Sequence, residues 1–199
     1  MNDSDPTIRT IRIDADAIRV LAHPLRTRLL GLLRLEGPAT ATALAKALDT
    51  NTGATSYHLR KLAEVGLVEE TGEGSGRERW WGAAQDVHSW SPSDFAGEPD
   101  AEAAREWLEA EHLRRFVEHV QAWTAEASDW PMEWRDAADA SDYTLRLSPS
   151  ALREMEREIQ QVIERYRAAG ESAGGEDAKR VRYYVHAVPE LVHLKGGVR

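Results

Sequence analysis

The stretch that decides the fold is residues 40–71, which read TATALAKALDTNTGATSYHLRKLAEVGLVEET. Its apolar spacing predicts two short helices joined by a tight turn, the first of them over residues 41–48. Asp49 and Thr50 supply the turn between them. Asn51 is suited to begin the next helix, because its side-chain oxygen can accept a hydrogen bond from an otherwise unpaired amide.

The second helix is predicted from Thr52 to Val65. Thr55, Leu59 and Leu62 recur at helical spacing and form its core-facing side. Gly66 stands where a left-handed residue would end the helix. The opposite side combines small or polar residues with cations, which suits base edges and phosphates in a DNA major groove. The residues expected to face DNA are Thr52, Gly53, Ser56, Tyr57, Arg60 and Lys61.

A β-hairpin is predicted directly after this helix. Residues 67–71 and 77–81 have strand composition and are joined by the glycine-rich residues 72–76. Arg77 and Arg79 share one face of the second strand and are expected to reach the DNA backbone or a minor groove. Two helices followed by a hairpin make a winged helix-turn-helix.

Four short segments in order resemble the ArsR-type winged-helix regulators of bacteria. They are residues 23–30 (HPLRTRLL), 43–45 (ALA), 56–62 (SYHLRKL) and 66–68 (GLV), and the resemblance covers about residues 14–85. It implies a homodimeric transcription factor, most often a repressor released by an effector, with the DNA-reading helix on residues 52–65 and the wing on 67–82. The chain departs from the metal-sensing members, because its helix 41–48 lacks their cysteine motif.

Composition limits the remaining function classes. The chain has 199 residues and no cysteine, which excludes disulfides and thiolate metal sites and fits the cytoplasm. No apolar run approaches about 20 residues and the N-terminus is polar, so neither a membrane span nor a signal peptide is expected.

The net charge of −9 lies outside the predicted DNA-binding half. Residues 1–85 hold 11 basic and 11 acidic residues, whereas residues 86–199 hold the other 14 and 23. A neutral winged helix must rely on where its cations are placed, so about three to six phosphate contacts per dimer are expected.

The segments around the winged helix are predicted as follows. Residues 7–13 have strand character, Asp14 caps a helix to Leu21, and a helix begins at Pro24 and runs to about residue 35. Residues 88–99 are predicted to be a linker whose Trp90 and Phe95 pack onto the winged helix. Asp100 is expected to cap a long helix to residue 127, whose apolar side is buried either in a dimer or against the C-terminal region.

The last third is predicted as a strand (142–147), a helix (149–168) and a strand (179–188), paired in parallel and needing a third strand. The expected fold class is therefore α+β and mainly helical. Residues 1–95 form the winged helix-turn-helix domain. Residues 96–199 form a helical or α+β region for dimerisation and effector sensing.

Other chemistry is weaker in the sequence. His112 and His119 are seven residues apart with glutamates beside them, but a solvated charged helix face explains them better than a metal site, and no cofactor is expected. Five tryptophans lie beyond residue 85 and fit either core and interface packing or a pocket for a small-molecule effector. His58 is expected to be buried and bonded to backbone. No catalytic constellation is present, so an enzyme is not expected.

The prediction is a regulator that binds double-stranded DNA in a sequence-specific manner, more often a repressor than an activator, as a homodimer on a palindromic site. Its partners would be duplex DNA, a second copy and an effector, with no membrane. The alternative is a winged helix that serves as a protein-interaction module, with the acidic half binding a basic partner.

Overall fold

The computed structural model describes residues 9–72, 78–173 and 178–190. The chain divides into two compact units, Met1–Ala138 and Asp139–Arg199. No helix among the described residues is long and apolar enough to cross a membrane. The fold is α+β and mainly helical, as predicted.

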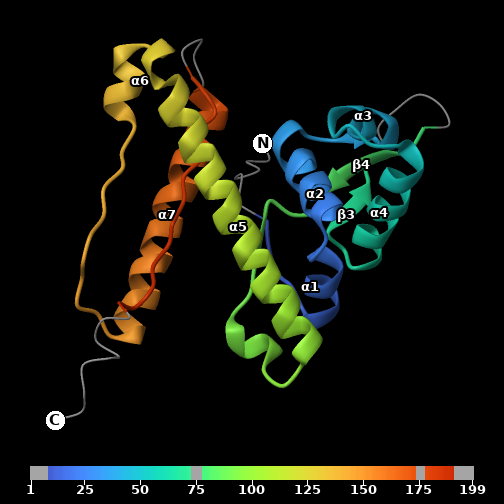
Figure 1. Cartoon of the computed structure of the whole chain (residues 1–199), viewed down its shortest axis with the longest axis horizontal. Helices are drawn as coiled ribbons and strands as arrows, with labels where there is room; N and C mark the ends of the chain where they lie inside the picture. The colour runs from blue at the N-terminus through green and yellow to red at the C-terminus, as the bar shows by residue number, and fades with distance from the viewer. Residues whose placement is uncertain (1–8, 73–77, 174–177, 191–199) are drawn as a thin grey trace, which may run out of the picture. The chain divides into compact units, whose positions relative to one another are not determined.

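Four short helices open the first unit (Figure 1): α1 (Ala15–Leu21), α2 (Pro24–Glu36), α3 (Ala41–Ala47) and α4 (Thr52–Glu64). A side chain caps the start of each of them, and two of these caps were predicted, Asp14 and Asn51. Asp14 accepts a hydrogen bond from the Ala17 amide, and Asn51 accepts one from the Ala54 amide, both at 2.8 Å. Gly66 follows α4 with φ of 69°, a left-handed conformation that stops the helix at little steric cost.

Five short strands form two small sheets. In the larger sheet β4 (Trp80–Ala83) lies between β2 (Ala39–Thr40) and β3 (Val68–Glu70) and is antiparallel to both. Glu70 is opposite Trp81 in the β3–β4 pair, so the predicted hairpin after α4 is confirmed. In the smaller sheet β1 (Thr10–Arg12) pairs in parallel with β5 (Val87–Ser89). The segment 7–13, which was predicted to have strand character, therefore contributes a strand that pairs within the chain.

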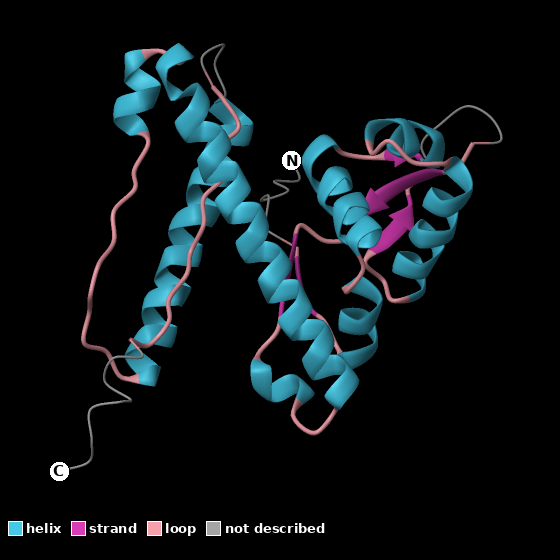
Figure 2. Cartoon of the chain, viewed as in Figure 1, coloured by secondary structure: helices cyan, strands magenta, loops and turns pink. Residues whose placement is uncertain are grey.

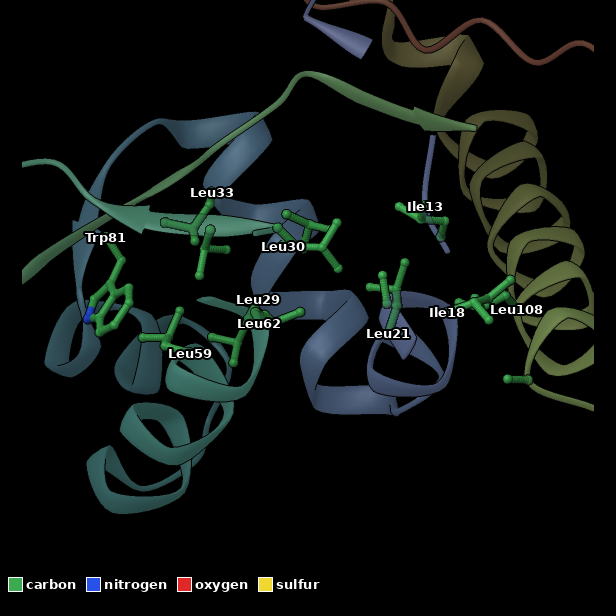
Figure 3. Packing of buried hydrophobic residues seen from close by; sticks show 14 of the residues in the cluster. Ile13, Ile18, Leu21, Leu29, Leu30, Leu33, Leu59, Leu62, Trp81 and Leu108 are labelled. Carbon is green, nitrogen blue, oxygen red and sulfur yellow. The ribbon is translucent and has the colours of Figure 1, made fainter. Parts of the chain in front are cut away.

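One hydrophobic core joins the helices to the sheet (Figure 3). Leu59 and Leu62 of α4 are buried with Leu29 and Leu30 of α2, and Trp81 of β4 closes that end. At the other end, Ile13 and Ile18 lie toward Leu108 of α5 (Pro99–Glu126). Helix α4 is thus anchored in the core by the three residues predicted to face it, Thr55, Leu59 and Leu62.

The predicted linker 88–99 is wrong. These residues continue β5 and then form the 3₁₀ helix η1 (Pro92–Phe95), in which Phe95 is completely buried in the core. Trp90 is partly buried against the same core, so the packing predicted for both aromatics is confirmed. The polar Ser-Pro-Ser sequence is typical of a linker, but here Ser91 and Asp94 form a capping box that begins η1.

The long helix is confirmed, but Asp100 does not cap it. Helix α5 begins at Pro99 after Glu98, no side chain caps it, and Asp100 lies inside the first turn. Its first half packs on α1, with Ala101, Ala104 and Leu108 buried. Its second half leaves Leu113, Val117 and Val120 exposed, and it continues into η2 (Ala127–Asp129) and α6 (Met132–Ala137).

The second unit is built around α7 (Pro149–Ala173), which runs five residues past its expected end. The predicted strands 142–147 and 179–188 are wrong: neither segment forms a strand or a bridge. Figure 2 shows the chain on either side of α7 as loop rather than strand. Exposed apolar side chains run through the unit, namely Tyr143, Leu145, Leu147, Met155, Val162, Ile163, Tyr166, Val181, Tyr183, Val185 and Val188.

Candidate nucleic-acid interface

Helix α4 presents its predicted polar residues in two strips. Thr52, Ser56 and Arg60 are four residues apart along one strip, and Gly53, Tyr57 and Lys61 follow the same spacing on the next. Because side chains at i and i+4 lie one above the other on a helix, each strip is a continuous row. Four of the six residues, Thr52, Gly53, Tyr57 and Arg60, are exposed, and Ser56 and Lys61 are half-buried.

The first strip lines a groove. Its walls come from the start of α3, the N-terminal half of α4 and the base of the hairpin. The lining residues are Thr40, Ala41, Thr42, Thr52, Ser56, Arg60, Glu78, Arg79 and Trp81. The fold therefore brings Thr52, Ser56 and Arg60 together with Arg79, as the sequence predicted, although they are up to 27 positions apart.

The cations of this surface already have partners in the free chain. Arg79 forms an ion pair with Glu70 across the hairpin at 2.9 Å, and Lys61 forms one with Glu64 at 2.8 Å. The bond to Glu64 is the first cause of a raised Lys61 pKa. Exposed pairs of this kind contribute little to stability, so phosphates can displace the glutamates at small cost.

Arg77, the other hairpin arginine predicted to contact DNA, lies outside the described residues. Arg60 is described and points back along its helix, where its Nε donates to the Ser56 carbonyl at 3.1 Å. This bond holds the Arg60 side chain against α4, and Arg60 is one of the residues that line the groove. Two arginines, Arg60 and Arg79, thus flank the described part of the groove.

Gly53 is helical rather than frayed. A Cβ at this position would lie 3.3 Å from the Asn51 side-chain oxygen that caps α4. Any larger residue would press on that oxygen and on its hydrogen bond to Ala54. The glycine therefore protects the start of the helix. This role could not be predicted from its low helix propensity.

Sequence reasoning missed Thr40 and Thr42. Thr40 caps α3 by accepting from the Ala43 amide at 3.2 Å, and Thr42 is exposed in the first turn of the same helix. Both line the groove opposite α4. The signal was present in the sequence, because Thr-Ala-Thr before an apolar-periodic segment is a helix start whose free amides favour anions.

His58 supports α4 rather than facing the groove. Its ring lies 4.4 Å from the ring of His23 at the start of α2, and Tyr57 meets it edge-on at 5.1 Å. The expected backbone bond is wrong for Nδ1, which is buried without a hydrogen-bond partner in the described part of the chain. Burial, followed by the charges of His23 and Arg26, lowers the His58 pKa, so the imidazole is neutral at pH 7.

The aromatic and histidine residues of α5 pack in clusters. His112 stacks on Trp90 at 6.0 Å and lies near His88, while Glu111 is bound by Arg114 and Arg115. Groups of three or more histidine, aspartate or glutamate side chains able to hold a metal are absent from the described residues. Further along, Trp123, Trp130 and Trp134 contact one another edge-on at 5.5 and 6.1 Å.

A helix-turn-helix domain family model matches residues 21–71. Among solved structures, the homodimeric winged helix-turn-helix DNA-binding domain of a possible ArsR-family regulator from Mycobacterium bovis is 25% identical. That match covers 51% of this chain and 77% of the other, with a TM-score of 0.33. A protein described as a possible transcriptional regulator for arsenical resistance is 31% identical over 52% of this chain and 95% of the other, with a TM-score of 0.32. No curated protein sequence matches significantly.

The match covers α2, α3, α4 and β3. The family model thus places a helix-turn-helix domain over the residues where the sequence pattern predicted one, α4 included.

Proposed function

We propose that this chain, whose N-terminal half is an ArsR-like winged helix-turn-helix, binds a specific double-stranded DNA sequence and represses transcription in the cytoplasm. The observation that carries the proposal is the groove, where Thr52, Ser56 and Arg60 of α4 meet Arg79 of the hairpin. Short polar groups that face base edges, framed by cations that reach phosphates, are the combination that sequence-specific binding requires.

The two strips of α4 have different roles in this proposal. Ser56, Tyr57 and Arg60 read or frame bases, whereas Lys61, Arg77 and Arg79 hold phosphates, with Thr52 and Gly53 at the helix start closest to the backbone. Tyr57 is 51% exposed although it is large and aromatic, which leaves it free to contact base edges. Thr40 and Thr42 add phosphate contacts from the start of α3.

The protein acts as a homodimer in this proposal. Two copies would place their α4 helices about 34 Å apart in successive major grooves, so the site would be a palindrome with that half-site spacing. The exposed apolar half of α5, with Leu113, Val117 and Val120, provides surface for association.

A pair of variants tests the assigned roles. Arg79→Ala removes a sequence-independent phosphate contact, so it should weaken binding to specific and random duplexes by a similar factor. Tyr57→Ala should weaken binding mainly to the specific duplex, by about 10- to 100-fold, because one base-edge contact accounts for about 1–3 kcal/mol of discrimination. Both affinities are measured by fluorescence anisotropy at about 100 mM salt, a condition that must be fixed because binding depends on salt.

Thr42→Ala is a further groove variant in this experiment, and Arg153→Ala is its control. Thr42 lines the groove and should weaken binding to both duplexes by less than Arg79→Ala, because its hydroxyl is uncharged, whereas Arg153 lies in α7 and should change neither affinity. Equal effects of Tyr57→Ala and Arg79→Ala on both duplexes would contradict the assignment.

A small-molecule effector that releases the DNA is the second part of the proposal. The edge-on contacts of Trp123, Trp130 and Trp134 gather three amphipathic aromatic rings at the end of α5, and such rings commonly line effector pockets. If the alternative of a protein-interaction module held instead, the full chain would bind no duplex at about 100 mM salt, where non-specific attraction is already weakened.

A further inference from the structure

Three aromatic rings, those of His23, His58 and Tyr57, form a row that connects α2 to the exposed side of α4. The His58 ring lies 4.4 Å from that of His23, and the Tyr57 ring meets it edge-on at 5.1 Å. Adjacent positions on a helix point about 100° apart, so this contact means that the Tyr57 ring is turned toward His58. Lys61, one turn further along α4, lies 6.0 Å from the centre of the same ring. Tyr57 is exposed, yet its neighbours restrict how it is oriented.

Restricting Tyr57 before DNA arrives favours sequence reading. A side chain that is already ordered loses less conformational entropy when it binds. A fixed ring also fits only those base edges that match its orientation, whereas a freely rotating ring adapts to many. The ring row therefore contributes to specificity through Tyr57, although His23 and His58 do not face the groove.

His23 must be neutral to keep its place in the row. It is the N-cap of α2, and its Nδ1 accepts a hydrogen bond from the Leu25 amide at 3.1 Å. A protonated imidazole carries a proton on both nitrogens and cannot accept a hydrogen bond. Protonation would therefore break the cap and place a positive charge at a helix N-terminus, where the free amides already disfavour one.

His58 is also suited only to the neutral form. Its Nδ1 is buried without a hydrogen-bond partner in the described part of the chain. A proton on that nitrogen would be a buried donor with no acceptor, which is costly. The charges that act on the ring are those of His23 and Arg26, both from α2 and both positive when protonated. Protonation of His58 would therefore be opposed by repulsion as well as by burial.

Charges from the other elements around α4 are directed elsewhere. Helix α4 also packs on α1, α3 and β3. The charged side chains of those elements are exposed or bound to other groups: Asp16 and Arg19 of α1, Lys46 of α3, and Glu69 and Glu70 of β3. The balance at the ring row is therefore decided by α2 and α4 themselves.

We propose that His23 and His58 are positioning residues for Tyr57, and that sequence-specific DNA binding requires both imidazoles to be neutral. This inference rests on the proposed DNA-binding function and names two further residues on which its specificity depends. The two histidines act on DNA only through the tyrosine.

A double-mutant cycle in the full chain tests that dependence. The probes are the duplex that the unmodified chain selects from a random pool and a scrambled duplex of the same base composition, compared by fluorescence anisotropy at about 100 mM salt. His58→Ala should raise the Kd of the selected duplex about 10-fold and that of the scrambled duplex less than about twofold. Added to Tyr57→Ala, His58→Ala should raise neither Kd further, because its effect passes through the ring already removed.

The pH profile supplies a readout that a purely structural role would not change. Burial is the first cause of the lowered pKa of both histidines, so they protonate below pH 6.5. The preference for the selected duplex should be constant from pH 8 to 7 and fall below pH 6.5, by at most about tenfold per pH unit for each imidazole. Affinity for the scrambled duplex should not fall, because added positive charge favours phosphates.

His58→Phe is the rescue variant. It keeps a ring beside Tyr57 and replaces the buried unpaired nitrogen with carbon, so the preference at pH 7.5 should stay within about twofold of the unmodified chain. Its fall at low pH should be shallower, because only His23 still titrates in the row. Thr55→Ala, a buried truncation in the same helix, should lower the free energy of unfolding without changing the preference.

The outcomes separate this inference from the proposed function. Tryptophan fluorescence during urea unfolding identifies the pH values at which each variant is folded, and affinities are compared only there. Additive losses in the cycle, or a preference that stays constant below pH 6.5, would overturn the positioning role while leaving DNA binding intact. A chain that selects no duplex at pH 7.5 would overturn the proposed function, and this inference with it.

Discussion

At the residue scale, Asn51 connects the chain's sequence to the position of α4, the helix that we propose reads DNA. It lies outside α4, yet its side chain closes the first turn on the Ala54 amide, and a Cβ on Gly53 would lie only 3.3 Å from its oxygen. This one residue therefore fixes where the helix starts and which residues face the groove.

Asn51→Ala should destabilise the first unit by about 1 kcal/mol, the usual cost of losing an N-cap. Tryptophan fluorescence during urea unfolding measures the change, since every tryptophan lies in that unit. Thr52→Ala is the matched control, because it removes a neighbouring exposed hydroxyl that caps nothing. Equal losses in the two variants would show that the cap is not the cause.

His88 gives stability a dependence on pH. Burial, then the charge of Arg34, then His112, lowers the His88 pKa from 6.5 to about 3. The unfolded chain therefore binds this proton more readily than the folded chain between those values, and folding stability is lost as pH falls below about 6.5. At pH 7 and above His88 is neutral in both states and contributes no pH dependence.

His88→Gln should flatten the decline of the thermal midpoint between pH 7 and pH 4. His23 and His58, whose pKa values are lowered mainly by burial, keep part of the slope. Gln121→Ala, an exposed change on α5 that removes no titratable group, should leave the profile as it is. An unchanged slope in His88→Gln would refute the role of this buried imidazole.

At the element scale, sequence patterns found the elements that are stabilised locally. Helices α1 to α4 and the hairpin were predictable because caps, apolar spacing and Gly66 all indicate the same boundaries. The β1–β5 pair and η1 were not, because they depend on contacts between residues about 77 apart, such as Thr10 with Val87. The local sequence of a short polar segment does not indicate that such a distant partner exists.

Phe95 shows how much the missed element matters. Phe95→Ala should cost about 3–5 kcal/mol of unfolding free energy, because the ring is fully buried and its loss leaves a cavity. Ser93→Ala, exposed in the same 3₁₀ helix, should cost less than about 0.5 kcal/mol. Chemical denaturation of both variants measures the difference, and a small cost for Phe95→Ala would mean that residues 92–95 are a linker after all.

The same contrast between local patterns and distant contacts explains which residues of the candidate site were predictable. The α4 residues were predictable, since helical spacing alone separates its polar side from its core side. Thr40 and Thr42 could be recognised from sequence only as a helix start, because the tertiary fold alone brings the start of α3 across from α4 and the hairpin. The strands 142–147 and 179–188 failed for a different reason: their sequences alternate as strands do, but neither segment forms a bridge within the described residues.

At the scale of the whole molecule, charge is divided between the two halves of the sequence. The balance of −9 lies in residues 86–199, so DNA attraction depends on a few placed cations rather than on a basic surface. The logarithm of the binding constant should fall with the logarithm of salt concentration with a slope of about −3 to −5, as expected for three to six phosphates. A slope near zero between 50 and 200 mM salt would rule out this mode of binding.

The central claim is that α4 and the hairpin read a DNA sequence, and selection of duplexes from a random pool by the full chain at about 100 mM salt tests it most directly. The account predicts enrichment of an inverted repeat whose half-site centres are about 10 base pairs apart, and loss of that enrichment in Tyr57→Ala. A final pool no different from the starting pool, or the same enrichment with Tyr57→Ala, would contradict it.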